Sequence, residues 1–474
     1  MSDALFEQND ESEADAPEAD VWNPGRRMSG EHAFPAISID EIAARACREP
    51  LDRERLELAR KVCRNSKSRL LVDGVDPRRP EQAGWGVVFP AEGKSEIRQA
   101  LKPLIEWRRA QVAASDGSRF RELYGDRGYR NGESLSDFLD RHRASYDVVD
   151  PRRFPYYWLL AGSPEEIPFA FQSQLDLQHG VARLDFSTPD EYGDYAEKVI
   201  RAEQKSRLPR QRRAVYFCPT VDRVTTRIVR QLVKPLVRKF QTDPVSGWTL
   251  DLILGEEATR QRLIDILDGS DPADLLFTAS HGVFCEPTDP NQREQQGGLW
   301  CQDGPVIAAD LHNINCEPNL VGFHFACFGA GTERWDEFER ESDGTPIVRA
   351  ARPFTASLPQ NLLKQGALAI LGHIGRSWTS SFNRTGDSGG DSEPPLLEVF
   401  SMTLRRLLQG NPVGHALEPF NVRYAADTAK LADLNLARRF GAHNEIRHAE
   451  VFRSFLDARN FVVLGDPVAK IPGS

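Results

Sequence analysis

The sequence predicts an α/β fold with a mainly parallel β-sheet. Short apolar segments bounded by glycine, proline or polar residues alternate along the chain with longer segments that have the apolar spacing of a helix. Such alternation is typical of β–α–β units, whose strands run in the same direction. With 474 residues the chain also exceeds the size of one ordinary hydrophobic core, so we expect more than one domain.

A smaller, non-catalytic α/β subdomain is predicted over residues 36–205. Helical spacing is found at 40–63, 94–112 and 191–204, and apolar segments with the character of buried strands lie at 84–90, 156–162 and 180–186.

A larger α/β domain is predicted over residues 206–474. Its six predicted strands lie at 213–219, 248–255, 273–282, 320–327, 367–375 and 461–467. Helical segments at 222–240, 256–269 and 356–366 separate several of them. Asp222 is placed to cap the first of these helices, and Asp466 is placed to brace the turn before Pro467.

The net charge of −10 is concentrated at the N-terminus. Residues 1–20 hold eight carboxylates and no lysine or arginine, whereas the rest of the chain is nearly balanced. The apolar content of this segment is too low to offset the loss of conformational entropy on ordering. We therefore expect residues 1–35 to form a disordered acidic tail. The basic residues form no stripe, which argues against a nucleic-acid surface.

The sequence also predicts a cytoplasmic protein that does not bind a membrane. No apolar run approaches the roughly 18 to 20 residues of a spanning helix, and the N-terminus lacks the layout of a signal peptide. Seven cysteines, thinly spread, do not resemble a disulfide framework, so we expect reduced thiols. A reduced thiol is available as a nucleophile.

Two predicted strands end on residues that can do chemistry. The strand at 273–282 ends in His281 and Gly282, and the strand at 320–327 ends in Cys327. The carboxyl ends of parallel strands meet at one edge of a sheet, so we expect the imidazole and the thiol to face one crevice. A nearby histidine can take the proton of a thiol during attack, and the N–H groups of Gly282 and Cys327 can stabilise an oxyanion.

The same segments resemble the signatures of a known peptidase clan. "TASHG" at 278–282 and "FHFACFGAGT" at 323–332 are similar to the His-Gly and Ala-Cys motifs of the caspase/gingipain/separase clan, especially its CHAT-domain branch. The similarity covers about residues 85–467 and is strongest after Arg213. It implies a caspase-like α/β/α sandwich preceded by a gingipain-like α/β subdomain.

The resemblance also implies an activity. Cys327 would be the nucleophile, His281 the general acid/base and Gly282 an oxyanion-hole donor of a cysteine endopeptidase that forms an acyl-enzyme and needs no cofactor. CHAT-type peptidases are dedicated effectors, in bacteria often linked to defence or programmed death, so we expect a specific protein substrate. Two departures are the Phe328-Gly329 pair after the cysteine and the absence of tetratricopeptide repeats.

We expect the activity of such an enzyme to be restrained until an activating partner or a neighbouring subunit of a homo-oligomer releases it. The loop at 285–298 begins four residues after His281 and is rich in polar residues and proline, so we expect it to act as the switch. The acidic tail with its junction at 23–31 is the less favoured alternative.

A substrate pocket is expected near the strand end at 373. His373, Arg376 and Trp378 would line it, although packing of this loop on the sheet edge explains them equally well. Similarity to gingipains favours a basic residue before the scissile bond, whereas Arg376 favours an acidic one. His324, between two phenylalanines, is most simply a core residue.

Three alternatives stay open. A second dyad is formed by His179 and Cys218, although Pro219 removes the backbone N–H next to that cysteine. A zinc site would use ligands from a cluster of histidines and cysteines, namely His281, Cys285, Cys301, His312 and Cys316. The third is a scaffold that keeps the caspase-like fold without turnover.

Overall fold

The computed structural model describes most of the chain. The described residues are 20–21, 25–34, 37–48, 51, 53–65, 71–146, 148–205, 211–311, 320–341, 343–378, 382, 396–442 and 444–472.

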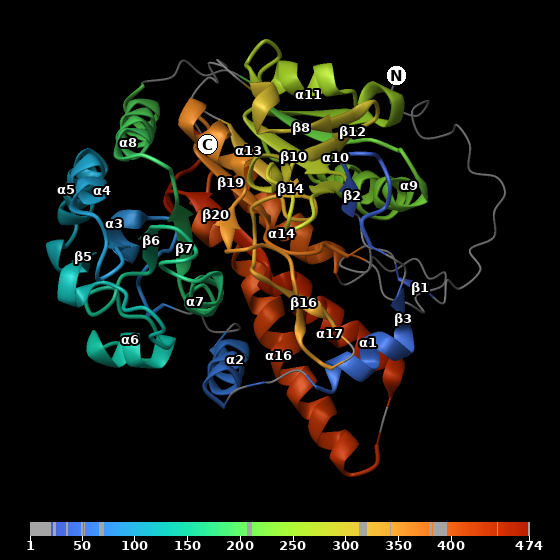
Figure 1. Cartoon of the computed structure of the whole chain (residues 1–474). Helices are drawn as coiled ribbons and strands as arrows, with labels where there is room; N and C mark the ends of the chain where they lie inside the picture. Colours follow the sequence, from blue (N-terminus) through green and yellow to red (C-terminus); the bar gives the residue numbers. More distant parts are fainter. Residues whose placement is uncertain are drawn as a thin grey trace.

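A ten-stranded sheet forms the centre of the molecule (Figure 1). Its strands, in spatial order, are β5 (Phe120–Leu123), β4 (Trp85–Val88), β6 (Tyr157–Ala161), β7 (Gly180–Leu184), β20 (Phe461–Gly465), β19 (Ala369–His373), β14 (Val321–Phe325), β10 (Leu275–Ala279), β8 (Arg212–Cys218) and β9 (Trp248–Leu254). Every pair is parallel except β19 with β20. This confirms the predicted α/β class and its mainly parallel sheet.

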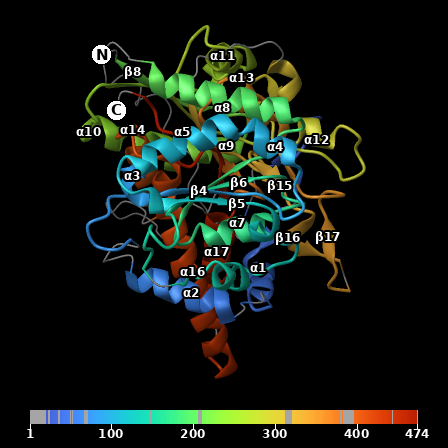
Figure 2. The same ribbon diagram turned by 90° about the vertical axis from the view of Figure 1, so that its left-hand side faces the viewer.

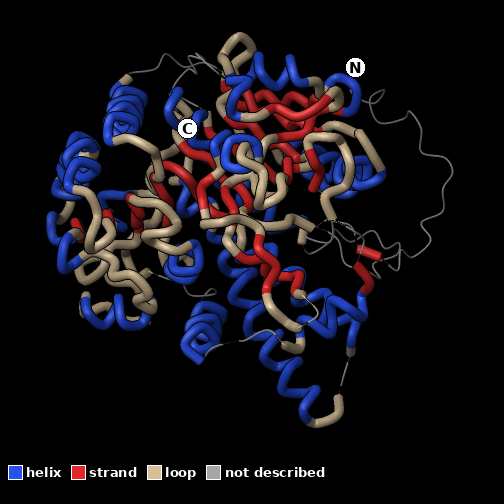
Figure 3. The backbone as a smooth tube through the Cα atoms, viewed as in Figure 1, coloured by secondary structure: helices blue, strands red, loops and turns tan. Residues whose placement is uncertain are grey.

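Helices cover the sheet on both faces (Figure 3), which explains why its central strands are buried along their whole length. Figure 2 shows α4 (Ser95–Ala100), α5 (Lys102–Ala113) and α8 (Pro189–Gln204) lying side by side over the first strands. α1 (Ile39–Ala46) packs on α17 (Glu445–Arg459), and α2 (Arg53–Asn65) packs on α16 (Glu418–Arg439). Among the described residues no helix is long and apolar enough to span a bilayer.

The sheet is continuous across the predicted boundary near residue 205. β7 pairs with β20, with Arg183 opposite Leu464. Asp466, directly after β20, accepts a hydrogen bond from the Trp85 indole (3.0 Å) and pairs with the buried Arg108 guanidinium. Asp466 therefore links the last strand to the first half of the chain, besides bracing the turn through the Val468 N–H (3.4 Å). The boundary itself stays a prediction.

Part of the predicted disordered tail is ordered in the structure. Residues 25–34, called the N-terminal hairpin below, start with β2 (Gly25–Arg27) and turn back so that the Ala33 N–H donates to the Gly25 carbonyl (2.9 Å). β2 pairs in parallel with β11 (Gly282–Phe284). The acidic residues 1–19 lie outside the described residues, and Asp20–Val21 form β1, which pairs with β3 (Ile37–Ser38). The prediction is wrong for residues 25–34, where Ala33 and Phe34 supply apolar side chains that are buried.

The irregular region after β10 is also built into the fold. β11 pairs with β12 (Leu299–Cys301), which pairs with β13 (Gly304–Val306). Between β11 and β12 lies α12 (Gln292–Gln295). The Gln296 side chain donates to the Thr332 hydroxyl (2.7 Å) and is buried.

Candidate active site

The structure brings His281 and Cys327 to one edge of the sheet. β10 and β14 are parallel neighbours with Ala279 opposite Phe325, and each candidate lies two residues beyond its strand. A Cβ atom on Gly282 would lie 1.8 Å from the Cys327 carbonyl oxygen. No side chain fits in that space, so a glycine is required for the backbones of the two strand ends to approach.

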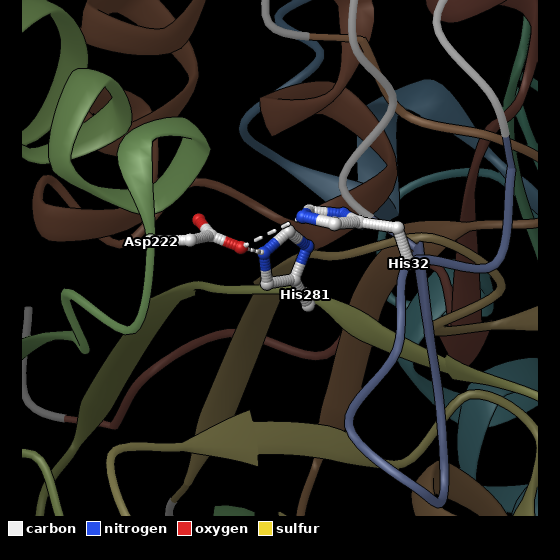
Figure 4. Close-up of side chains that lie close together, drawn as sticks. All are labelled: His32, Asp222 and His281. Atoms are coloured by element: carbon white, nitrogen blue, oxygen red, sulfur yellow. Dashed lines mark hydrogen bonds and ion pairs between the residues drawn. The ribbon is translucent and has the colours of Figure 1, made fainter.

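His281 is held by Asp222 (Figure 4). The imidazole is buried, and its Nε2 lies 2.6 Å from Asp222 Oδ2. A carboxylate only accepts hydrogen bonds, so Nε2 carries the proton, which leaves Nδ1 as the basic nitrogen. Nδ1 has no hydrogen-bond partner among the described residues. The imidazole is therefore oriented in the tautomer that a general base needs.

Asp222 is fixed in turn by the start of a helix. It is the N-cap of α9 (Arg223–Ile228), and its Oδ1 accepts the Thr225 N–H (2.9 Å). Its Oδ2 also pairs with the Arg26 guanidinium (2.6 Å). Burial alone would raise the pKa of Asp222, but the interaction with His281 and the hydrogen bonds from the Thr225 N–H and the Arg26 guanidinium together lower it below its ordinary value. The carboxylate is consequently ionised at neutral pH.

Cys327 is buried. It is hydrogen-bonded to Ser377, which follows β19, the neighbour of β14 on the side away from β10. Its Sγ accepts the Ser377 N–H (3.3 Å) and lies 3.4 Å from the Ser377 hydroxyl. Burial raises the pKa of Cys327 to about 12, although the hydrogen bonds from Ser377 oppose this. The thiol is therefore protonated in this state.

The residue after the cysteine has an unusual backbone conformation. Phe328 has φ 58°, in the left-handed region that a bulky residue rarely adopts. Its N–H donates to the Gly375 carbonyl (2.8 Å), and the N–H of Ala330 donates to the His373 carbonyl (2.9 Å). The turn after Cys327 is thus locked to the segment that follows β19. Strained turns of this kind are common at functional sites.

A small pocket, with a cavity volume of about 30 Å³, opens beside this turn. It is lined by Phe328, Glu333, Trp335, Asp336, Glu337, Phe338, Arg349, Ile374, Gly375, Arg376, Trp378, Leu456 and Asn460. Arg376 and Trp378 line this pocket, whereas His373 does not, and its role in binding a substrate stays a prediction. The His373 ring is buried in the sheet, packed on Phe461 and 3.5 Å from an Asp457 carboxylate oxygen.

The charge of Arg376 is compensated inside the protein. Its Nη2 lies 2.8 Å from Asp336 and 2.9 Å from Glu339. Glu333 has a different environment, because burial, and after it the neighbouring Glu337, raise its pKa to about 7.

Two functional candidates were missed in the sequence. Asp222 was assigned only a capping role, although it follows the β8 strand end as His281 follows that of β10. The rule that functional residues lie at the carboxyl ends of parallel strands, called the strand-end rule below, would have indicated Asp222 if it had been applied to β8. His32 lies in the predicted tail, and its Nε2 is 3.6 Å from Asp222 Oδ2.

His32, Asp222 and His281 are the one group of potential metal ligands within the described ranges, with donor atoms within 4.8 Å of one another. The donor set does not fit a divalent cation well, because the Arg26 guanidinium occupies the same Asp222 oxygen. The zinc ligands considered in the sequence are not grouped here: Cys285 and Cys301 belong to no such group, and His312 and Cys316 lie outside the described residues.

The alternative dyad is not assembled. His179 precedes β7 and Cys218 ends β8, and the sheet order places β20, β19, β14 and β10 between these strands. His179 Nδ1 instead lies 3.0 Å from the Pro155 carbonyl, and the Cys218 thiol donates to the Ala279 carbonyl. Both are structural residues of the core.

The chain is similar in structure to solved proteases. A structure described as that of a protease aligns over 82% of this chain and 78% of its own, with 13% identity and a TM-score of 0.46. The complex of the pro- and mature domains of RgpB from Porphyromonas gingivalis aligns over 82% and 79%, with 12% identity and a TM-score of 0.43.

A chain of the Saccharomyces cerevisiae separase–securin complex aligns over 70% of this chain and 17% of its own, with 13% identity and a TM-score of 0.33. No protein-family model matches the sequence, and no curated protein matches it. Similarities at this level give no residue correspondence, so the CHAT-domain resemblance and the residue roles stay predictions.

Proposed function

We propose that the chain is a cysteine endopeptidase with Cys327 as nucleophile and His281 as general acid/base, oriented by Asp222. The observation that carries this proposal is the juxtaposition of two strand ends, one with a thiol and one with an imidazole hydrogen-bonded to an ionised carboxylate. A histidine oriented by a carboxylate is the arrangement that activates serine and cysteine nucleophiles in unrelated folds.

The steps follow from these groups. The Cys327 thiol proton passes to His281 Nδ1 as sulfur bonds to the substrate carbonyl carbon, and the backbone N–H groups of Gly282 and Cys327 stabilise the oxyanion. His281 then protonates the leaving amine, the C–N bond breaks and a thioester remains. Water attacks the thioester, loses a proton to His281 and releases the carboxylic acid as the C–S bond breaks. The thiol is restored, and no cofactor takes part.

The pocket beside Cys327 supports a preference for a basic residue before the scissile bond. Arg376, which favoured an acidic residue on sequence grounds, is neutralised by Asp336 and Glu339. Glu333 also lines the pocket, and burial raises its pKa to about 7. An arginine or lysine side chain would pair with it and lower its pKa, which stabilises the complex.

The proposal includes the wider role that the resemblance implies. The enzyme would be a regulated effector that cleaves one partner protein in bacterial defence or programmed death. Expression of the chain with and without Cys327→Ala, followed by comparison of the cleaved proteins in the host, tests this role.

Activity is tested with a peptide library and a thiol-reactive peptide probe. Cleavage should be lost in Cys327→Ala and in His281→Ala, and retained in Cys218→Ala, the matched control at another buried strand end. In protein that cleaves peptides, the probe should label Cys327, and this labelling should be lost in His281→Ala. Cleavage by Cys327→Ala would refute the proposal. Equal labelling of several cysteines without cleavage would favour the scaffold alternative.

A further inference from the structure

The N-terminal hairpin, residues 25–34, touches each part of the proposed catalytic site. Its strand β2 pairs with β11, with Gly25 directly opposite Gly282. Backbone of the hairpin therefore lies beside the glycine that follows His281. β2 runs parallel to β11 at the edge of the small sheet that β12 and β13 complete.

Polar side chains of the hairpin hold the carboxylate that orients His281. Arg26 Nη2 lies 2.6 Å from Asp222 Oδ2, and His32 Nε2 lies 3.6 Å from the same atom. The His32 and His281 rings meet edge to face, with centroids 5.7 Å apart (Figure 4). The hairpin thus contacts the same Asp222 oxygen that orients His281.

Apolar side chains of the hairpin lie in the same buried cluster as the thiol. Ala33 and Phe34 form one buried cluster with Cys327, Phe284 and Phe328. The Phe34 ring also lies over the Arg376 guanidinium, 3.7 Å from its central carbon, next to the pocket. Cys327 is 0% exposed in this arrangement. A nucleophile must come within roughly 3 to 3.5 Å of the carbonyl carbon, which no substrate can achieve at a covered thiol.

We propose that the N-terminal hairpin is an internal plug that closes the catalytic site, and that the enzyme becomes active when the plug is displaced. The proposal rests on the proposed function for the identity of the site. The plug and a substrate compete for the same surface, so anything that pulls residues 25–34 away from β11 activates the enzyme.

The contacts favour this element over the loop at 285–298, which the sequence suggested as the switch. Gln292 in that loop is buried and donates to the Arg349 carbonyl (2.6 Å), and Gln296 is buried against Thr332. The hairpin makes its contacts at the catalytic residues themselves, and its turn at Met28 and Ser29 is exposed. Buried hydrogen bonds hold the loop in place, whereas the exposed hairpin turn is accessible to a partner.

Alkylation of Cys327 by iodoacetamide tests the plug in the full-length protein. The rate for each cysteine is measured by mass spectrometry of the digested chain. Phe34→Ala should raise the rate at Cys327 about tenfold or more, because it removes a large ring from the cluster that buries Cys327. Met28→Ala, an exposed residue of the same hairpin, should leave the rate unchanged. Equal rates at Cys327 in the parent chain and in Phe34→Ala would overturn the proposal.

A second variant guards against misfolding. Arg26→Ala combined with His32→Ala removes the polar contacts of the hairpin and should also speed labelling of Cys327. Cys218, buried in β8, should stay unlabelled in every variant, since its labelling would report unfolding. Labelling requires no hydrolysis, so a chain that never cleaves peptides refutes the proposed function and leaves this test intact. Equal cleavage rates in the parent and in Phe34→Ala would refute the plug alone.

Discussion

Replacing Asp222 by asparagine separates the catalytic role of this residue from its structural role. Asparagine caps helices about as well as aspartate, so its oxygen can still accept the Thr225 N–H and start α9. It loses the negative charge that faces His281 and Arg26. Its amide N–H₂ can also donate to Nε2, which would move the imidazole proton to Nδ1, the nitrogen that must accept the thiol proton.

The size of the effect follows from the 2.6 Å hydrogen bond to a buried imidazole. A hydrogen bond to a charged group contributes about 1.5–3 kcal/mol, which corresponds to a rate decrease of roughly 10- to 150-fold. Stabilising the wrong tautomer adds to this loss, so we expect kcat to fall at least about 100-fold. The free energy of unfolding should fall by about 1–3 kcal/mol, because the cap is kept but the charged hydrogen bonds with Arg26 and His281 are weakened.

The assay compares Asp222→Asn with its parent in the Phe34→Ala background, so that the hairpin limits neither protein. Peptide cleavage gives kcat and KM, and denaturant unfolding gives stability. Asp271→Asn is the matched control, since Asp271 pairs with Arg213 (2.6 Å) before β10, at the opposite end of the strand from His281. An unchanged kcat in Asp222→Asn, or an equal loss in Asp271→Asn, would refute the orienting role of Asp222.

Three further changes test other parts of the structure. Gly282→Ala should abolish cleavage and destabilise the fold by roughly 1–3 kcal/mol or more, because its Cβ would lie 1.8 Å from the Cys327 carbonyl oxygen. Gly117→Ala, whose Cβ meets only a methyl group at 4.0 Å, should be tolerated in the same unfolding and cleavage assays. Burial lowers the pKa of His324 from 6.5 to about 4, so its neutral form stabilises the fold above pH 6.5 and this contribution is lost as the pH falls toward 4. The melting temperature of His324→Asn should therefore fall less than that of the parent as the pH is lowered from 6.5 to 4. An identical fall in both proteins would contradict the lowered pKa of His324. Glu333→Gln should raise KM for substrates with arginine before the scissile bond while leaving those with alanine unchanged, and an equal change for both would count against a basic pocket.

The hydrophobic pattern of the sequence determined most of the sheet. Strands buried on both faces need continuous apolar segments, which made β10 and β14 visible without a structure. β5 was missed, because at the edge of the sheet its residues FREL are mostly half-buried and carry two charges. The strand-end rule then indicated His281 and Cys327, since position along a strand is a local property.

Only the tertiary structure decided which groups face those two residues. Asp222, the N-terminal hairpin and the Ser377 segment reach the site from distant parts of the chain, and nothing in their local sequence encodes that meeting. The same holds for Arg376, whose charge favoured an acidic substrate until Asp336 and Glu339 were found beside it. Hydrogen bonds, ion pairs and the cover over a thiol depend on distances between residues far apart in sequence, and those distances are set by how the strands and helices pack.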